Sequence, residues 1–331
     1  MRAAVLERFG EPLELREIAR PTPREGEVLV RVRAVGLCGT DLKVVDGVLP
    51  GLRLPLIPGH EIAGEIVAGD GELLGARVAC YLYEPCGRCR WCRSSDHALC
   101  PDAARIGRSR DGGLAEYVVL RKENVFPFTA VSFAAAAVAM DAVATPWRAL
   151  RVRGGLRAGE RVAISGAGGL GLNAVQVAVN AGASVAVFDP DATAREKALA
   201  LGAEVALTPE RARDAVDWSS GGVDLGLEAS GRRAGFEALV ACTRPGGRVV
   251  CCGYAPGSTW EMDSMCLVLS ELAVIGSRAG SREDARNALA AVEAGDIVPA
   301  IASTLPLEDV NDAFSRLRHG GLAGRLMIEI P

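Results

Sequence analysis

The sequence lacks any cluster of lysine and arginine residues, and its 37 basic and 41 acidic side chains give a formal net charge of −4. Nucleic acids and anionic membrane surfaces are bound through concentrated positive charge, so neither class of partner is expected. The sequence also has no uninterrupted apolar run of about 18 residues or more, and no signal-peptide stretch follows Met1. We therefore expect a soluble, cytoplasmic protein that acts on small molecules.

Aromatic residues are scarce at 5%, and we find neither an internal repeat nor a low-complexity segment. Apolar residues nonetheless make up 49% of the chain and charged residues 24%, a balance that excludes a disordered or fibrous protein. The 39 glycines indicate many turns that depend on glycine. A chain of 331 residues is long enough for two domains.

Two patterns of secondary structure divide the chain. Between residues 2 and 120, short β-branched runs alternate with glycine and proline, which predicts an all-β, barrel-like module. From residue 161 onward, strands alternate with helical segments, and this alternation predicts an α/β fold with a doubly wound parallel sheet. Strands are expected at 161–166, 183–189, 223–230, 247–253 and 272–277, and helices at 169–182, 194–202 and 281–295.

A glycine-rich loop follows the strand expected at 161–166. Gly166, Gly168 and Gly171 form the pattern G-x-G-x-x-G, with Gly169 as an additional glycine, and a helix follows. The first glycine permits a tight turn, the second lets the backbone approach a pyrophosphate, and the third lets the helix pack on the strand. The alternative is a turn that packs without a ligand. Because the glycine-rich loop lies between an expected strand and an expected helix, we predict that it binds a dinucleotide.

Asp189 ends the next strand, close to the spacing of about 20 residues expected for the acid that binds the ribose of NAD. Its carboxylate would accept hydrogen bonds from the ribose hydroxyls and would repel a 2′-phosphate, so NAD is favoured over NADP. A nearby cation, Arg195, could weaken that preference, but we expect it on a solvated helix face.

Four of the ten cysteines, Cys86, Cys89, Cys92 and Cys100, lie within one short segment. Four thiolates at this spacing can surround one tetrahedral zinc ion and leave no open position, so this zinc would be structural. Disulfides between neighbouring cysteines and a lobe without metal are the alternatives, and a reducing compartment disfavours the first. His97 lies inside the lobe but exceeds the number of ligands required.

Only three histidines are present, His60, His97 and His319. His60 lies in the segment PGHE at 58–61, and Cys38 lies in GLCGTD at 36–41. A single His or Cys after a strand is usually a packing residue. Together with the four-cysteine lobe, DGGLAEY at 111–117 and GAGGLG at 166–171, however, these segments make the whole chain resemble the zinc-dependent medium-chain dehydrogenase/reductase family, the alcohol and polyol dehydrogenases.

The resemblance implies a fold and a division of the chain. A GroES-like β-barrel catalytic domain would comprise residues 1–142 and 278–331, with the structural zinc lobe at 86–100. A Rossmann NAD-binding domain would comprise residues 143–277. The resemblance also implies a homodimer or homotetramer and two zinc ions per chain, one catalytic and one structural.

The resemblance further assigns roles around a catalytic zinc. Cys38 and His60 would be ligands, Thr40 would hold the substrate hydroxyl, and Asp41 and Glu61 would be acids beside the ligands. Thr145 would touch the nicotinamide.

The third zinc ligand has two candidates, because Asp141 stands where many relatives have Cys. A carboxylate oxygen is an accepted zinc ligand, and we favour ligation by Asp141. The alternative is that Asp141 only forms hydrogen bonds near the site while Glu61 binds the ion.

Two further positions allow more than one interpretation. Many relatives carry His where this chain has Lys43, and Lys43 could release a proton to water only if its pKa were lowered. Arg325 resembles a C-terminal cation near the cofactor pyrophosphate in the family, and its other interpretation is a surface charge.

The predicted function is hydride transfer between an alcohol and NAD through a zinc-bound alkoxide, with secondary, cyclic and polyol alcohols as candidate substrates. One alternative is a zinc-free quinone or enone reductase on the same fold. Another is a nucleotide-binding protein without catalysis, suggested by the changes at Asp141 and Lys43.

Overall fold

The computed structural model describes all residues from 1 to 331, and the chain folds into two compact units. The first unit comprises Met1–Asp141, Gly280–Gly295 and Ile301–Pro331, and the second comprises Ala142–Ala279 and Asp296–Ala300. The expected division placed 296–300 with the first unit, and this is wrong. The Gln176 side chain exchanges hydrogen bonds of 2.8 Å with the backbone of Val298, which attaches this segment to the second unit.

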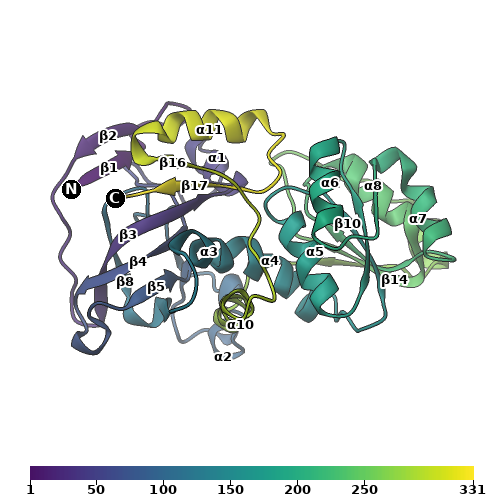
Figure 1. Cartoon of the computed structure of the whole chain (residues 1–331), viewed down its shortest axis with the longest axis horizontal. Coiled ribbons are helices and arrows are strands. Elements are labelled where there is room, and N and C mark those ends of the chain that lie inside the picture. Colours follow the sequence, from purple (N-terminus) through teal and green to yellow (C-terminus); the bar gives the residue numbers. More distant parts are fainter. The chain divides into compact units, whose positions relative to one another are not determined.

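The first unit is built on an antiparallel sheet (Figure 1). Most of β3 (Glu27–Leu37) is buried, and Val28, Val30 and Val32 are fully buried in the core. The strand order is β16 (Ile301–Pro306), β17 (Arg325–Glu329), β3, β4 (Glu61–Ala68), β5 (Arg77–Cys80) and β9 (Val125–Pro127), with β8 (Tyr117–Arg121) paired to β3. Only the pair β16–β17 is parallel.

The first unit also contains one hydrophobic core and several further short elements. Its largest fully buried side chains include Leu6, Leu37, Ile62 and Leu120, which lie in one core. The other strands are β1 (Arg2–Val5), β2 (Glu14–Glu17), β6 (Tyr83–Glu84) and β7 (Ala104–Arg105), and the helices are α1 (Gly39–Val45), α2 (Arg90–Arg93), α3 (Phe133–Val138), α10 (Arg282–Glu293) and α11 (Val310–His319).

The second unit contains a six-stranded parallel sheet in the order β12 (Val205–Leu207), β11 (Ser184–Phe188), β10 (Arg161–Ser165), β13 (Val223–Glu228), β14 (Thr243–Cys251) and β15 (Ala273–Gly276). If the six strands are numbered 1 to 6 in the order in which they occur in the chain, their order in the sheet is 3-2-1-4-5-6. This order confirms the predicted doubly wound sheet. The strand order reverses between β10 and β13, because successive strands are added on one side of β10 and then on the other. Folds of this kind bind their ligands at that point, outside the carboxyl ends of the strands.

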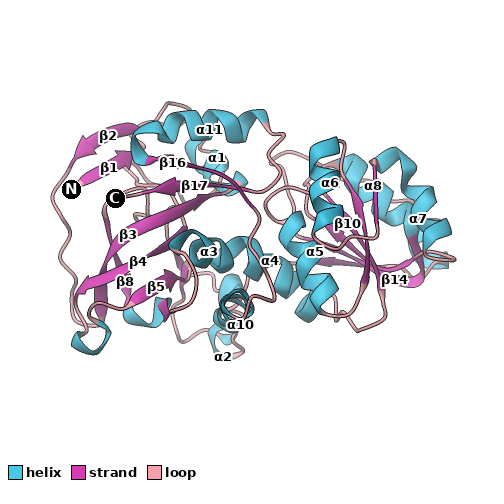
Figure 2. Ribbon diagram, viewed as in Figure 1, coloured by secondary structure: helices cyan, strands magenta, loops and turns pink.

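Helices flank the second sheet (Figure 2). α5 (Gly171–Asn180) packs on β10 and β11, and α8 (Arg233–Cys242) packs on β10 and β13. The other helices are α4 (Ala144–Trp147), α6 (Ala192–Ala200), α7 (Ala212–Trp218) and α9 (Ser264–Leu269). Across the whole structure, no helix has both the length and the apolar character needed to cross a membrane.

Candidate active site and metal centres

Four buried side chains of the first unit gather at one point: Cys38, His60, Glu61 and Asp141. Their possible ligand atoms all lie within 4.8 Å of one another. Cys38 lies between β3 and α1, His60 directly precedes β4, Glu61 begins β4, and Asp141 lies in the π-helical turn Ala139–Val143. We call these four residues the donor cluster.

Glycines give the donor cluster its space. Gly36 on β3 pairs in register with Glu61 on β4, and a Cβ at Gly36 would overlap the Glu61 carboxylate. Gly59 has a φ of +92°, a left-handed conformation that favours glycine, and it places His60 at the start of the strand. Glycine is therefore required at position 36 to leave room for Glu61, and it is favoured at position 59 by the backbone conformation.

Asp41 orients two members of the donor cluster at once. Its Oδ2 accepts a 2.9 Å hydrogen bond from the backbone N–H of Cys38, and its Oδ1 lies 3.0 Å from Nδ1 of His60. With a proton on Nδ1 directed at Asp41, His60 presents its Nε2 lone pair to the cluster, where Nε2 lies 3.6 Å from Asp141 Oδ2. Burial lowers the pKa of His60, but Asp41 and the neighbouring hydrogen bonds outweigh it and raise this pKa well above its usual value.

Arg325 on β17 brings a buried cation to the donor cluster. It is 5% exposed, and its Nη2 lies 2.7 Å from Oε1 of Glu61 and 3.5 Å from Oδ2 of Asp141. The interpretation of Arg325 as a surface charge is therefore wrong. β17 pairs with β3 next to Cys38, and this pairing carries the side chain into the interior.

The electrostatics of the donor cluster fit a bound cation. Burial raises the pKa of Glu61 well above its usual value, and neither of its buried carboxylate oxygens accepts a well-directed hydrogen bond. Burial opposes ionisation of Asp141 and Cys38 as well, but His60 lowers the pKa of Asp141 and Arg325 lowers that of Cys38. Thiolate, imidazole and carboxylate groups are the ligand types that zinc accepts.

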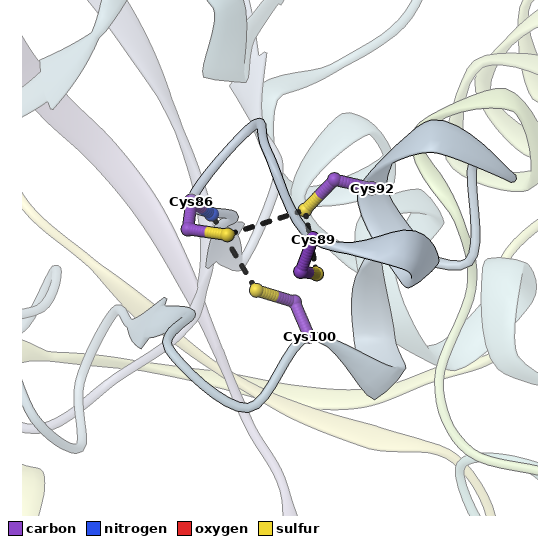
Figure 3. A group of neighbouring side chains, drawn as sticks. All are labelled: Cys86, Cys89, Cys92 and Cys100. Carbon is purple, nitrogen blue, oxygen red and sulfur yellow. Dashed lines mark hydrogen bonds between the residues drawn. The ribbon is translucent and has the colours of Figure 1, made fainter.

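The four cysteines of the lobe also converge, and their sulfur atoms lie within 4.8 Å of one another (Figure 3). The Sγ atoms of Cys89 and Cys92 are 3.5 Å apart, and those of Cys86 and Cys92 are 3.8 Å apart. Tetrahedral zinc with bonds of about 2.3 Å separates its sulfur ligands by roughly 3.8 Å, so this arrangement fits one ion. All four cysteines are free of disulfides.

The surroundings of Cys86 and Cys92 shift the pKa values of these two thiols in opposite directions. Backbone N–H groups of Arg88 and Cys89 lower the pKa of Cys86 to about 6, whereas burial raises that of Cys92 to about 12. His97 does not join the sulfur cluster, and its ring instead packs edge-on against Tyr81 at a centroid distance of 6.5 Å.

The glycine loop of the second unit has the form expected of a dinucleotide cradle. Gly166 follows β10 with a φ of +91°, and a Cβ at Gly171 would overlap the Gly166 carbonyl oxygen. A Cβ at Gly168 would meet no atom within 4 Å, so the backbone there is open to a ligand.

Asp189 lies beside this loop. Its Oδ2 accepts a 2.7 Å hydrogen bond from the N–H of Ala167, and its Oδ1 accepts one of 2.9 Å from the N–H of Asp191. The expectation that Arg195 lies on a solvated helix face is wrong. It is half-buried, and its Nη1 donates to the carbonyl oxygens of Asp189 at 2.8 Å and Pro190 at 2.9 Å.

Comparison with known proteins agrees with both units. Residues 24–130 match the family "Alcohol dehydrogenase GroES-like domain", and residues 169–294 match "Zinc-binding dehydrogenase". An alcohol dehydrogenase of Geobacillus stearothermophilus is 38% identical over 340 residues, covering 100% of both chains. The chain belongs to the zinc-type medium-chain dehydrogenase/reductase family. It is an oxidoreductase with a GroES-like and a Rossmann-type domain.

Two further members of the dehydrogenase/reductase family show its range. A crystal structure described as an NAD-dependent alcohol dehydrogenase has a TM-score of 0.94, 29% identity and full coverage of both chains. An acryloyl-coenzyme A reductase of Metallosphaera sedula is 30% identical over 335 residues and covers 99% of each chain. The family thus includes proteins named for alcohol oxidation and for reduction of an unsaturated thioester.

The other predicted site residues of this dehydrogenase/reductase lie on helices α1 and α4. Thr40 is on the first turn of α1, close after Cys38, and Lys43 is half-buried on the same helix, where burial lowers its pKa. Thr145 is 5% exposed and belongs to α4 in the second unit. Glu228, a fully buried acid at the end of β13, was not among the predicted site residues, although an acid at a strand end beside the glycine loop was a visible signal.

Proposed function

We propose that this oxidoreductase transfers a hydride between an alcohol and NAD, with a catalytic zinc held in the donor cluster. Secondary, cyclic and polyol alcohols are the candidate substrates. The observation that carries the proposal is the convergence of Cys38, His60, Glu61 and Asp141 within 4.8 Å.

Cys38, His60 and Asp141 would hold the zinc. The 3.6 Å between His60 Nε2 and Asp141 Oδ2 is close to the separation of roughly 3.4 Å between nitrogen and oxygen ligands of a tetrahedral zinc. Glu61, by contrast, is held by Arg325 at 2.7 Å, which favours Asp141 as the third ligand. Zinc bound here would supply Lewis acidity toward the oxygen of an alcohol or carbonyl substrate.

The chain's own residues prepare the site. Asp41 fixes the tautomer and orientation of His60 and holds the backbone of Cys38, so two ligands keep one geometry. Thr40 would hold the substrate hydroxyl by accepting a hydrogen bond from it at Oγ1. Arg325 neutralises one of the carboxylates and keeps the cluster from carrying excess negative charge.

NAD would bind in the second unit. The glycine loop leaves the backbone at Gly168 open to a pyrophosphate, and N–H groups at the start of α5 favour phosphate there. The Asp189 carboxylate at the end of β11 favours the ribose of NAD over a 2′-phosphate. The name of the structural neighbour with a TM-score of 0.94 supports the same cofactor.

The test uses zinc-loaded full-length protein and a panel of secondary, cyclic and polyol alcohols with NAD and NADP. We expect NADH formation with at least one alcohol, and its loss when zinc is removed from the donor cluster without unfolding. Full activity of folded protein without zinc in this cluster would contradict the proposal.

Reduction of an enoyl thioester is the second candidate, because a relative of 30% identity bears the name acryloyl-coenzyme A reductase. Oxidation of NADH or NADPH by acryloyl-coenzyme A, with no NADH formed from any alcohol, would favour this candidate over alcohol oxidation.

A further inference from the structure

Glu228 lies at the point where the strand order in the sheet of the second unit reverses. It is the last residue of β13 and is 0% exposed. Its register partners are Ser165, the last residue of β10, and Cys251, the last residue of β14. Gly166, the first glycine of the dinucleotide loop, directly follows Ser165. Glu228 therefore lies at the carboxyl edge of the two strands between which a doubly wound sheet binds its ligand.

The Glu228 carboxylate accepts hydrogen bonds only from donors of its own loop. Oε1 accepts from the backbone N–H groups of Ser230 and Gly231, both at 2.9 Å, and from the Ser230 hydroxyl. Oε2 accepts from Gly231 at 3.1 Å. Backbone N–H groups can only donate, so they stabilise the ionised carboxylate against the burial that raises its pKa. No arginine, lysine or histidine forms an ion pair with Glu228.

Glycines leave room for this carboxylate and for the turn that holds it. A Cβ at Gly253, in the loop after β14, would lie 2.7 Å from Oε2, and one at Gly235 would lie 3.3 Å from Oε1. A Cβ at Gly166 would lie 3.0 Å from Ser230, so the turn that holds the carboxylate rests against the dinucleotide loop. The loops after β10, β13 and β14 thus surround one negative charge without a positive partner.

A buried charge without a partner is costly, and a ligand that brings the opposite charge offsets that cost. The oxidised nicotinamide ring carries a positive charge and the reduced ring carries none. A dinucleotide on a doubly wound sheet places one half on each side of the point where strand order reverses. With the glycine loop and Asp189 on the adenosine side, the nicotinamide half of a bound dinucleotide would lie on the side of β13 and β14.

We propose that Glu228 determines which oxidation state of the cofactor this protein prefers, by stabilising the positive ring of NAD⁺ relative to the neutral ring of NADH. This inference rests on the proposed function, in which the second unit binds NAD. Its consequence is that the bound NAD⁺/NADH pair becomes more reducing than it would be without the carboxylate.

The test measures dissociation constants of NAD⁺, NADH and ADP-ribose for zinc-loaded protein and for the Glu228→Gln variant. ADP-ribose lacks the ring and reports on the rest of the site. We expect Glu228→Gln to raise the ratio Kd(NAD⁺)/Kd(NADH) by at least about threefold, as expected for one screened charge, and to leave ADP-ribose binding unchanged. Ser230→Ala, which removes a hydrogen bond but keeps the charge, should leave the ratio at the wild-type value.

Equal weakening of NAD⁺ and NADH by Glu228→Gln would overturn the inference and assign Glu228 a purely structural role, and so would an unchanged ratio. If Glu228→Gln does not fold, Glu228→Met, which is neutral and needs no hydrogen bonds, is measured in the same way and judged by the same ratio. Wild-type protein that binds neither ADP-ribose nor NAD⁺ would instead contradict the proposed function.

Discussion

Arg325 Nη2 lies 2.7 Å from Oε1 of Glu61, and neither side chain is more than 6% exposed. This contact joins the last strand of the chain to the start of β4 at the donor cluster. Because both charges are buried, each depends on the other for compensation. The C-terminal strand is thus part of the candidate active site.

Replacing Arg325 by Met should destabilise the protein strongly, because it leaves Glu61 buried without its cation. Breaking a buried pair costs about 3–5 kcal/mol, whereas an exposed pair contributes about 1 kcal/mol or less. Denaturant unfolding measures both values, with Arg318→Met as the control, since Arg318 pairs with Asp46 on the surface. Adding Glu61→Gln to Arg325→Met should recover part of the loss. Equal small losses for Arg325→Met and Arg318→Met would contradict the account.

Asp141 and Asp41 should affect zinc affinity to different degrees. Removing an outer partner of a zinc ligand costs about 10–100-fold in affinity, which we expect for Asp41→Asn. Asp141→Asn removes a ligand and should cost more than Asp41→Asn. Competition with a chromophoric chelator measures both affinities. A smaller effect of Asp141→Asn than of Glu61→Gln would instead make Glu61 the third ligand.

The cysteine lobe should lose its metal when any one of its four thiols is removed. We expect Cys100→Ser to lower the zinc content by one ion per chain and the Tm by at least roughly 5 °C, because a structural zinc contributes folding free energy. Cys266→Ser, outside both clusters, is the matched control and should change neither. Unchanged zinc content in Cys100→Ser, measured by elemental analysis, would show that the lobe binds no zinc.

Local spacing explains which parts of the structure could be predicted. The glycine loop with Asp189 and the four-cysteine lobe each depend on residues near one another in sequence, and the structure brings them together as expected. The pairing of Glu61 with Arg325 joins residues from opposite ends of the chain, and nothing in the residues around either one indicates it. That contact follows from the antiparallel pairing of β17 with β3.

Side-chain hydrogen bonds to the backbone account for two of the errors. Arg195 was expected in solvent because it lies on a polar helix, but carbonyl groups at the end of β11 hold it. The family resemblance placed residues 296–300 in the first unit with the rest of the tail, but the side chain of Gln176 holds Val298 and that of Asn173 holds Ala300. Single polar contacts of this kind have no periodic pattern from which to predict them.

Asp224 should make the protein sensitive to acid. Burial opposes its ionisation, but the Arg161 N–H at 2.8 Å and the Arg244 side chain at 2.7 Å lower its pKa below the ordinary value of 3.8. A carboxylate with a lowered pKa stabilises the folded state above its ordinary pKa, and this contribution is lost as pH falls through the folded pKa.

We therefore expect Asp224→Asn to cost about 1–3 kcal/mol at pH 7, as for a hydrogen bond to a charged group, and less at pH 3. Denaturant unfolding at both pH values measures the difference. Asp312→Asn, in an exposed pair with Arg316, is the control and should cost little at either pH. A cost of Asp224→Asn that stays constant between the two pH values would contradict this assignment.

Zinc binding in the donor cluster is tested most directly by an anomalous-difference map of the crystallised protein at the zinc absorption edge. We predict two peaks per chain, one among the four cysteines of the lobe and one about 2.0–2.3 Å from Cys38 Sγ, His60 Nε2 and an oxygen of Asp141. A single peak in the cysteine lobe of zinc-saturated protein, with none between Cys38 and His60, would contradict a catalytic zinc in the donor cluster.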